Sequence, residues 1–268
     1  MKEHAQYHTT PISAMANTLA AILQVQDVAG SDELDEVVRF AYGADCARVV
    51  LFTPSAVGTE VLSHYQQHAA RLKDIAPMAV DMVVPHPADP VTSLASMYAG
   101  VQVDAKTAAR GFDEGTPPMR SLMTECKGKR RMAILMGDKH PARHLWQQTG
   151  AEILTGHSDM DVVTKAIECI RKDCYDFILV LVQEFDEMMH AARLYGKRCN
   201  AAMDNHLTEF NLLADAASVY MRDNTFIGFC PDHGCHRDAL GGGTHHSHRA
   251  DDLNVTHYFG VVSSLKQF

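Results

Sequence analysis

The sequence has few positive charges, with 24 Lys and Arg residues against 33 Asp and Glu residues, and its formal net charge is −9 over 268 residues. The one basic cluster is the short run from Lys127 to Arg131. A protein that binds nucleic acid through its phosphates needs an extended basic surface, and one short run does not supply it. The composition therefore argues against a nucleic-acid partner.

Long apolar runs and paired cysteines are also missing. No segment approaches the about 20 apolar residues that span a membrane. The run from Ala14 to Val25 follows Glu3 and two histidines, where a secretory signal would carry basic residues, so we interpret it as an N-terminal helix. The seven cysteines include no Cys-x-x-Cys spacing, which fits a reducing compartment. We therefore expect a cytoplasmic protein without a membrane partner.

Apolar strand-like runs and amphipathic stretches alternate along the chain. Strands are predicted at 48–52, 78–84, 131–136, 176–182, 225–230 and 256–261. Helices are predicted at 14–25, from Ser31 or Asp32 to about 40, and at 58–73, 91–98, 140–149, 159–171 and 188–222, with a long loop over 104–130. The unbroken apolar run at 176–182 is typical of a central parallel strand covered on both faces.

This order of elements predicts an α/β fold with a doubly wound, mostly parallel sheet sandwiched by helices. We expect one domain over residues 1–268, with residues 1–43 packed on it as an N-terminal helical segment. Ligands in such sheets bind beyond the carboxyl ends of the strands, so residues at those ends are the first to consider.

Histidines are concentrated toward the C-terminus, where six of the sixteen fall between His233 and His257. They lie in the sequence FCPDHGCH, which ends at His236, in the sequence GGGTHHSH, which ends at His248, and at His257 itself. An aspartate beside a histidine at the end of an apolar segment, with more imidazoles nearby, is what a first-row metal site requires.

Three segments at predicted strand ends carry these polar residues. After the central strand, Asp186 and His190 are four residues apart, so they share one face of a helix. Asp232 and His233 follow the next strand. The third segment holds His245, His246 and His248. A buried ion-pair network without metal is the alternative for each pair alone, but their conjunction at strand ends predicts a metal site.

This order of parts resembles the alkaline phosphatase superfamily of metal-dependent phosphatases, phosphodiesterases, sulfatases and phosphoglycerate mutases. That family carries Asp-x-x-x-His after a central strand, Asp-His-Gly after a later strand and a further C-terminal His. The matching residues here are Asp186 and His190, Asp232 to Gly234, and His245. The sequence is also similar to a bacterial branch of nucleotide pyrophosphatase-like proteins, in which Asp-His-Gly-Cys-His precedes a glycine-rich turn, a His and an Asp-Leu-Asn stretch, here Asp252 to Asn254.

The resemblance covers most of the chain from about Ala44 onward, and it implies an alkaline phosphatase-like core without a large cap domain. It also implies a centre of two divalent ions. The first ion would be held by Asp186, His190 and His245, and the second by Asp232 with His233. Zinc is favoured, and manganese and iron are the alternatives. His246 and His248 remain alternatives to His245.

The N-terminal half departs from the family at two positions. An aspartate after the first strand contributes to the second metal in the family, and the matching position here is Ser55. The nucleophilic Thr or Ser of the family falls on Asp89. We interpret Asp89 as a ligand of the second ion or a general base, with a helix N-cap as the alternative. Thr92 and Ser93 are rival nucleophiles if the register is displaced by a turn.

These features predict a metal-dependent hydrolase of a small anionic substrate such as a phosphate ester, in which metal-activated water replaces the Ser or Thr nucleophile. Glu184 is a second candidate for the general base, in addition to Asp89. The candidate substrate contacts are His236, Thr92 and His246. The alternatives are a lyase or isomerase on the same scaffold and a non-catalytic homologue that binds a metal or ligand.

Two further motifs are absent. The sulfatase signature Cys-x-Pro-x-Arg and its serine version do not occur, which disfavours a sulfatase. The run Gly241 to Gly243 does not resemble a phosphate-binding loop, because neither Lys-Ser/Thr nor G-x-G-x-x-G follows a strand there. Without a cap domain the site would be open or completed by a second subunit, and in the second case the protein would be a homo-oligomer.

Overall fold

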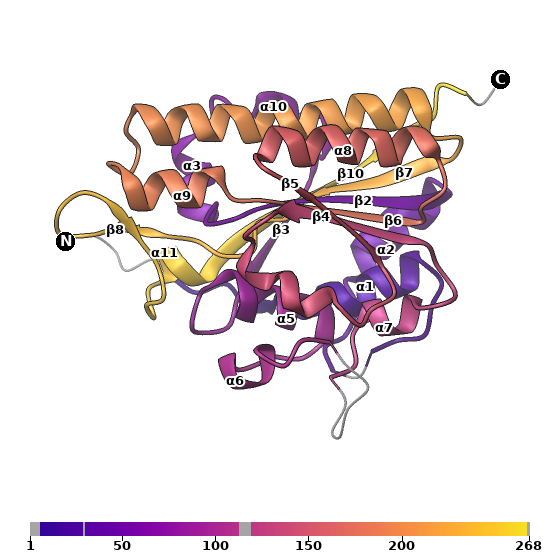
Figure 1. Cartoon of the computed structure of the whole chain (residues 1–268), viewed down its shortest axis with the longest axis horizontal. Helices are drawn as coiled ribbons and strands as arrows, with labels where there is room; N and C mark the ends of the chain where they lie inside the picture. Colours follow the sequence, from indigo (N-terminus) through magenta and orange to yellow (C-terminus); the bar gives the residue numbers. More distant parts are fainter. Residues whose placement is uncertain (1–5, 29, 113–118, 267–268) are drawn as a thin grey trace.

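A large twisted sheet forms the centre of the molecule (Figure 1). The computed structural model describes residues 6–28, 30–112 and 119–266. Eight strands lie in the order β1-β3-β10-β7-β2-β6-β4-β5. Their bounds are Thr10–Pro11, Met78–Val83, Asn254–Val262, Asn224–Phe229, Cys46–Pro54, Phe177–Val182, Met132–Gly137 and Glu152–Gly156 in that order. β10 is antiparallel to both of its neighbours, and the other pairs are parallel.

Alternate residues of the central strands point into two separate cores. In β6, Phe177, Leu179 and Leu181 belong to one apolar cluster, and Ile178, Val180 and Val182 belong to the other. This alternation follows from the two-residue period of a strand. Every residue of β6 is buried, so the prediction of a central strand covered on both faces is confirmed.

Two layers of helices cover the sheet (Figure 1). One layer consists of α1 (Ala14–Ile22), α2 (Asp35–Gly43), α5 (Pro90–Ala99), α6 (Ala105–Ala108), α7 (Leu122–Cys126) and the 3₁₀ helix η1 (Pro141–Trp146). The other consists of α3 (Thr59–His64), α4 (Ala70–Ile75), α8 (Asp159–Lys172), α9 (Glu184–Ala191) and α10 (Lys197–Tyr220). The predicted doubly wound, mostly parallel α/β sandwich is confirmed.

Several predicted helices were wrong in extent. The helix predicted at 188–222 is two helices, because the chain turns at Tyr195, which has φ 63°, and α10 starts after Gly196. The helix predicted at 58–73 is divided into α3 and α4. The one predicted at 140–149 is the shorter η1. Neither Ser31 nor Asp32 caps α2, which begins at Asp35, and the Ser31 Oγ instead lies 2.5 Å from the Ser13 Oγ.

Other elements did not stand out in the sequence. The edge strand β5 was not predicted, and the predicted loop over 104–130 contains α6 and α7 where it is described. Two short strands, β8 (His236–Arg237) and β9 (Gly243–Thr244), form a separate antiparallel ladder. The last helix, α11 (Ala250–Leu253), leads into β10. Within the described ranges, no helix combines the length and hydrophobicity needed to cross a membrane.

Candidate metal centre

Three neighbouring parallel strands end at the same edge of the sheet. β2 lies between β6 and β7 and runs parallel to both. Ser55 follows β2, Asp186 lies in the first turn of α9 after β6, and Asp232 follows β7. The edge formed by the carboxyl ends of parallel strands is where ligands bind in doubly wound folds.

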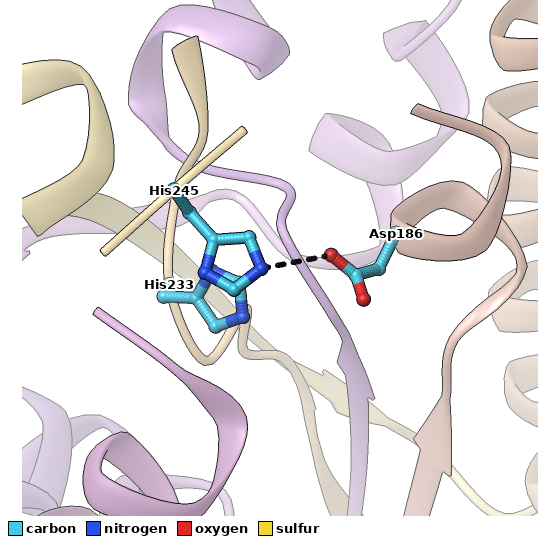
Figure 2. A group of neighbouring side chains, drawn as sticks. All are labelled: Asp186, His233 and His245. Atoms are coloured by element: carbon cyan, nitrogen blue, oxygen red, sulfur yellow. Dashed lines mark ion pairs between the residues drawn. The ribbon is translucent and has the colours of Figure 1, made fainter. Parts of the chain in front are cut away.

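Asp186, His233 and His245 converge at this edge (Figure 2). One potential ligand atom from each of them lies within 4.8 Å of the other two. The His245 Nε2 is 3.5 Å from the Asp186 Oδ1, and Figure 2 shows the carboxylate pointing from its helix toward the two imidazole rings. His190 joins the group, because its Nε2 lies 3.0 Å from the His245 Nε2 and 3.5 Å from the Asp186 Oδ1.

A hydrogen bond made by the Nδ1 atom fixes the tautomer of His233 and of His245. The His245 Nδ1 is 2.8 Å from the carbonyl oxygen of Ala88, and the His233 Nδ1 is 2.9 Å from that of Gly234. A carbonyl only accepts, so both Nδ1 atoms donate, and in the neutral form of each ring the Nε2 atom carries the lone pair. Burial, assisted by the neighbouring His233, lowers the pKa of His245 to about 3, so its ring is neutral at pH 7.

Several atoms of this cluster can accept a hydrogen bond or bind a cation, and one Asp186 carboxylate oxygen lacks a hydrogen-bond donor in the described part of the chain. The Asp186 Oδ1 is buried and has no hydrogen-bond partner among the described residues. Burial acts to raise the pKa of Asp186, but the His190 ring and the nearby His233 and His245 lower it on balance, so the carboxylate is charged at neutral pH. A carboxylate oxygen that faces the lone pairs of imidazole Nε2 atoms is the donor set of a divalent transition metal. The carbonyl groups bound to the Nδ1 atoms are the partners that such ligating histidines usually have. These residues therefore fit such an ion.

A proton on His190 is the alternative source of positive charge. Asp186 raises the pKa of His190, although partial burial opposes the shift, and a protonated His190 would donate to the His245 Nε2. A metal ion and this proton cannot both occupy the same lone pairs, so they compete.

We expect zinc affinity to fall as the pH falls through the raised pKa of His190. The protonated ring must lose its proton before an ion binds, so the apparent dissociation constant should rise about tenfold per pH unit below that pKa. Competition titrations with a chromophoric chelator between about pH 6 and pH 8 measure the slope. His190→Gln should bind more weakly with a flatter profile, and an unchanged slope in that variant would contradict the assignment.

Asp232 lies beside the cluster but is already hydrogen-bonded by the protein. Its Oδ1 accepts from the backbone N–H of His233 at 2.8 Å and of Ala56 at 3.3 Å, and its Oδ2 accepts from the Ser55 Oγ at 3.0 Å. The Ser55 Oγ is also 3.3 Å from the His233 Nε2. Burial raises the pKa of Asp232 to about 6, although His233 acts to lower it. Ser55 therefore occupies the place beside Asp232 where the resemblance implies a carboxylate.

Asp89 caps α5. Its Oδ1 accepts from the backbone N–H groups of Val91 at 2.9 Å and Thr92 at 3.0 Å, and its Oδ2 accepts from the Thr92 Oγ1 at 2.8 Å. Both carboxylate oxygens are thus used by the first turn of the helix, which is the alternative left open in the sequence. Thr92, a predicted substrate contact, is buried and directs its hydroxyl to Asp89.

Asp89→Ala is expected to lower the free energy of unfolding by about 1 kcal/mol, because the N-cap is lost. Asp89→Ser retains a capping oxygen, so it should stay close to wild type in both stability and metal content. Urea unfolding measures the first quantity and elemental analysis the second. A stable Asp89→Ser protein that has lost its metal would show that Asp89 is a ligand.

The remaining predicted residues lie in different places. The His246 ring is 3.9 Å from the His245 ring, and its backbone is left-handed at φ 73°. The His236 Nδ1 lies 2.6 Å from the Oδ1 of the buried Asp252, a contact that holds the ring. His248 stacks on His86 with ring centroids 3.6 Å apart, so the arrangement favours His245 as the ligand.

Glu184 faces away from the cluster. It accepts from the Asn205 Nδ2 at 2.9 and 3.2 Å and lines a cavity of about 850 Å³ on the other side of α9 from Asp186. The structure does not bring Glu184 to the metal ligands, and its role as a base stays a prediction.

Sequence reasoning missed His140. This imidazole follows β4 and is almost fully buried, and burial lowers its pKa to about 4 while the Asp186 charge acts in the opposite direction. Its Nδ1 accepts from the backbone N–H of Ala142 at 3.2 Å. No motif marked it, because a histidine before proline in an expected helix carries no distinctive spacing.

Comparisons with solved structures identify the fold. Phosphonoacetate hydrolase from Sinorhizobium meliloti 1021 in complex with phosphonoacetate matches 74% of the chain with a TM-score of 0.51 and 9% identity, over 59% of its own length. The soluble domain of lipooligosaccharide phosphoethanolamine transferase A from Neisseria meningitidis matches 81%, with a TM-score of 0.51 and 14% identity, over 78% of its length. Human ectonucleotide pyrophosphatase/phosphodiesterase 5 matches 72%, with a TM-score of 0.50 and 13% identity, over 58% of its length.

These matches confirm the α/β fold that the resemblance inferred from the sequence implies. At these identities the comparison shows the fold alone. The chain spans less than two thirds of the length of the phosphonoacetate hydrolase and of the human protein. Comparisons with protein-family models and with curated protein sequences gave no match.

Proposed function

We propose that the protein is a metal-dependent hydrolase of a small anionic ester, with phosphate esters as the favoured class. The convergence of Asp186, His233 and His245 at the carboxyl edge of the sheet carries the proposal. The three structural relatives support this class of substrate by their names. They are a phosphonoacetate hydrolase, a nucleotide pyrophosphatase/phosphodiesterase and a phosphoethanolamine transferase, all of which act on phosphorus-containing groups.

Four residues would hold the principal ion: Asp186, His190, His233 and His245. Zinc is favoured, because a set of imidazoles with one carboxylate suits it, and manganese and iron are the alternatives. When bound, such an ion supplies Lewis acidity toward a phosphoryl oxygen and lowers the pKa of water. The Ala88 and Gly234 carbonyls keep the two buried rings in the ligating tautomer.

The proposal assigns the attacking group to water because neither of the two candidate hydroxyls at the start of α5, those of Thr92 and Ser93, is exposed. Asp89 stands at the first position, the Thr92 hydroxyl is bound to it, and Ser93 is fully buried. His246 is exposed at the mouth of the site and held in a left-handed conformation next to the ligand His245, which favours a contact with the substrate.

A second ion is the remaining part of the proposal. It would use Asp232, whose carboxylate lies against His233, and Ser55 offers only a hydroxyl where the resemblance implies an aspartate. The oxygens of Asp232 and Asp89 are already hydrogen-bonded, so we propose that this half binds its ion more weakly than the first.

Elemental analysis of the purified protein, followed by an ester screen, tests the proposal. The protein would be reconstituted with zinc, manganese and iron, and then assayed on phosphate, phosphonate, sulfate and carboxylate esters. Turnover of one ester class with the bound metal is the expected result. Absence of bound transition metal, together with no activity after metal addition, would contradict it.

Two outcomes identify the alternatives. Stoichiometric metal without turnover of any ester would support a non-catalytic metal-binding protein. Consumption of a substrate without uptake of oxygen from labelled water would indicate a lyase or isomerase on the same scaffold.

A further inference from the structure

The first turn of α9 is held by side chains of two other helices. Gln183 precedes the helix, and its own side chain makes no cap. The first N–H groups of a helix have no partner within the helix, so they need outside acceptors. The backbone N–H groups of Gln183 and Glu184 donate to the Asp159 Oδ2 at 2.8 and 2.6 Å, and that of Phe185 donates to the His206 Nε2 at 3.2 Å.

His206 can accept only in one tautomer, and Glu209 selects it. The His206 Nδ1 lies 3.1 Å from the Glu209 Oε2, three residues further along α10. A carboxylate attracts the ring proton to Nδ1, which leaves Nε2 bare for the Phe185 N–H. His206 is fully buried and Glu209 is 1% exposed, so water does not replace either contact.

These contacts act directly beside a metal ligand. Asp186 is the next residue after Phe185, and His190 lies one turn further along the same helix of eight residues. The outer face of α9, formed by Glu184, Glu187 and Met188, borders the cavity of about 850 Å³. On that face Glu184 accepts from the Asn205 side chain, and Met188 packs on the edge of the core. Phe185 and Met189 anchor the inner face in the core. The network at its start is therefore the set of contacts that holds the backbone of the first turn.

We infer that His206, Glu209 and Asp159 are positioning residues for the metal centre, because they hold the helix that carries Asp186 and His190. None of the three belongs to the cluster of candidate ligands. A support of this kind keeps the ligand atoms at coordinating distances, and its loss typically costs 10–100-fold in metal affinity. The inference rests on the proposed metal-dependent function, and its test includes a readout that does not.

The experiment compares three substitutions in α10 in the full chain. His206→Leu removes the acceptor, and His206→Gln places an amide oxygen near the former Nε2. Phe210→Leu is the matched control, since Phe210 is fully buried in the same helix and its ring packs on Phe52 and Phe229, while it supplies no acceptor to α9. Zinc dissociation constants are measured by chelator competition at a temperature where all variants are folded.

We expect His206→Leu to weaken zinc binding at least about tenfold. Phe210→Leu should stay within about twofold of wild type, and His206→Gln should recover most of the loss, because it restores an acceptor without restoring the ring. Equal dissociation constants for His206→Leu and Phe210→Leu would overturn the inference, since the effect would then be general destabilisation.

Amide hydrogen exchange of the metal-free protein supplies the independent readout. His206→Leu should speed exchange at Glu184 and Phe185 by at least about tenfold, with little change in the middle of α8. If wild type binds no metal but this exchange pattern appears, the proposed function fails, while the role of the network in holding the start of α9 stands. If exchange in α9 is unchanged, the positioning role is overturned whatever the metal result.

Discussion

Asp186→Asn is expected to abolish tight binding of a transition metal and to reduce hydrolysis to background. The substitution keeps the size of the side chain but removes the charge that the imidazole lone pairs of His233 and His245 face. Loss of a carboxylate ligand should weaken zinc affinity by more than about 100-fold, because a neutral amide is a poor ligand for this ion. Elemental analysis after dialysis and the rate on the best ester measure the two effects.

Stability measurements separate a missing ligand from misfolding. The buried Oδ1 of Asp186 has no hydrogen-bond partner in the described part of the chain, so Asp186→Asn should leave the metal-free protein within about 1 kcal/mol of wild type in free energy of unfolding. Zinc at about 100 times its dissociation constant should stabilise wild type by about 2.7 kcal/mol and should not stabilise the variant. Asp204→Asn, at an exposed ion pair with His68, is the control that should behave as wild type. Full activity in Asp186→Asn would refute the assignment.

Ser55→Asp should convert the weaker half of the site into a second tight metal site. The new carboxylate would lie beside the Asp232 Oδ2 and the His233 Nε2, which are 3.0 and 3.3 Å from the present hydroxyl. Ser55 is 1% exposed, so two buried carboxylates without a cation should cost about 3 kcal/mol in the metal-free protein. Zinc should reverse that loss, and the bound metal should rise by about one equivalent per chain.

Ser55→Ala is the control for this substitution. It removes only the hydrogen bond to Asp232, at a cost of about 1 kcal/mol, and should leave the metal content unchanged. If Ser55→Asp remains destabilised in zinc and binds no additional ion, then Asp232 and position 55 are not arranged for a second metal.

The sheet was predictable because burial leaves a direct mark on sequence. A strand with both faces covered must be apolar at every position, as β6 is, and this is why its run of six residues stood out. The edge strand β5 contains the exposed Glu152 and three partly buried residues, so no apolar pattern marked it. The break between α9 and α10 depends on distant contacts, such as the Leu194 N–H to the Gly241 oxygen, which local sequence does not encode.

The candidate ligands were predictable because they follow strands that end together. Asp186, His233 and His245 were all named from the sequence, and the structure places them in one cluster. Their grouping differs from the one that the resemblance implied, because His233 faces Asp186 and His245 as well as Asp232. Such grouping depends on side-chain directions and on carbonyl partners such as Ala88, which residue spacing does not reveal.

The hydrogen bonds that hold the start of α9 could not be predicted from the sequence, for the same reason. His206 and Glu209 are three residues apart in a helix, a spacing that is common in solvated helical faces. Only the fold shows that both are buried and that His206 accepts from the helix that carries Asp186.

Anomalous diffraction at the zinc edge, from crystals of protein loaded with one equivalent of zinc, tests the central claim most directly. The account predicts a peak that lies about 2.0–2.2 Å from the Asp186 Oδ1 and from the Nε2 atoms of His233 and His245. A peak confined to the exposed pair His86 and His248, or no ordered zinc in the crystal, would contradict it.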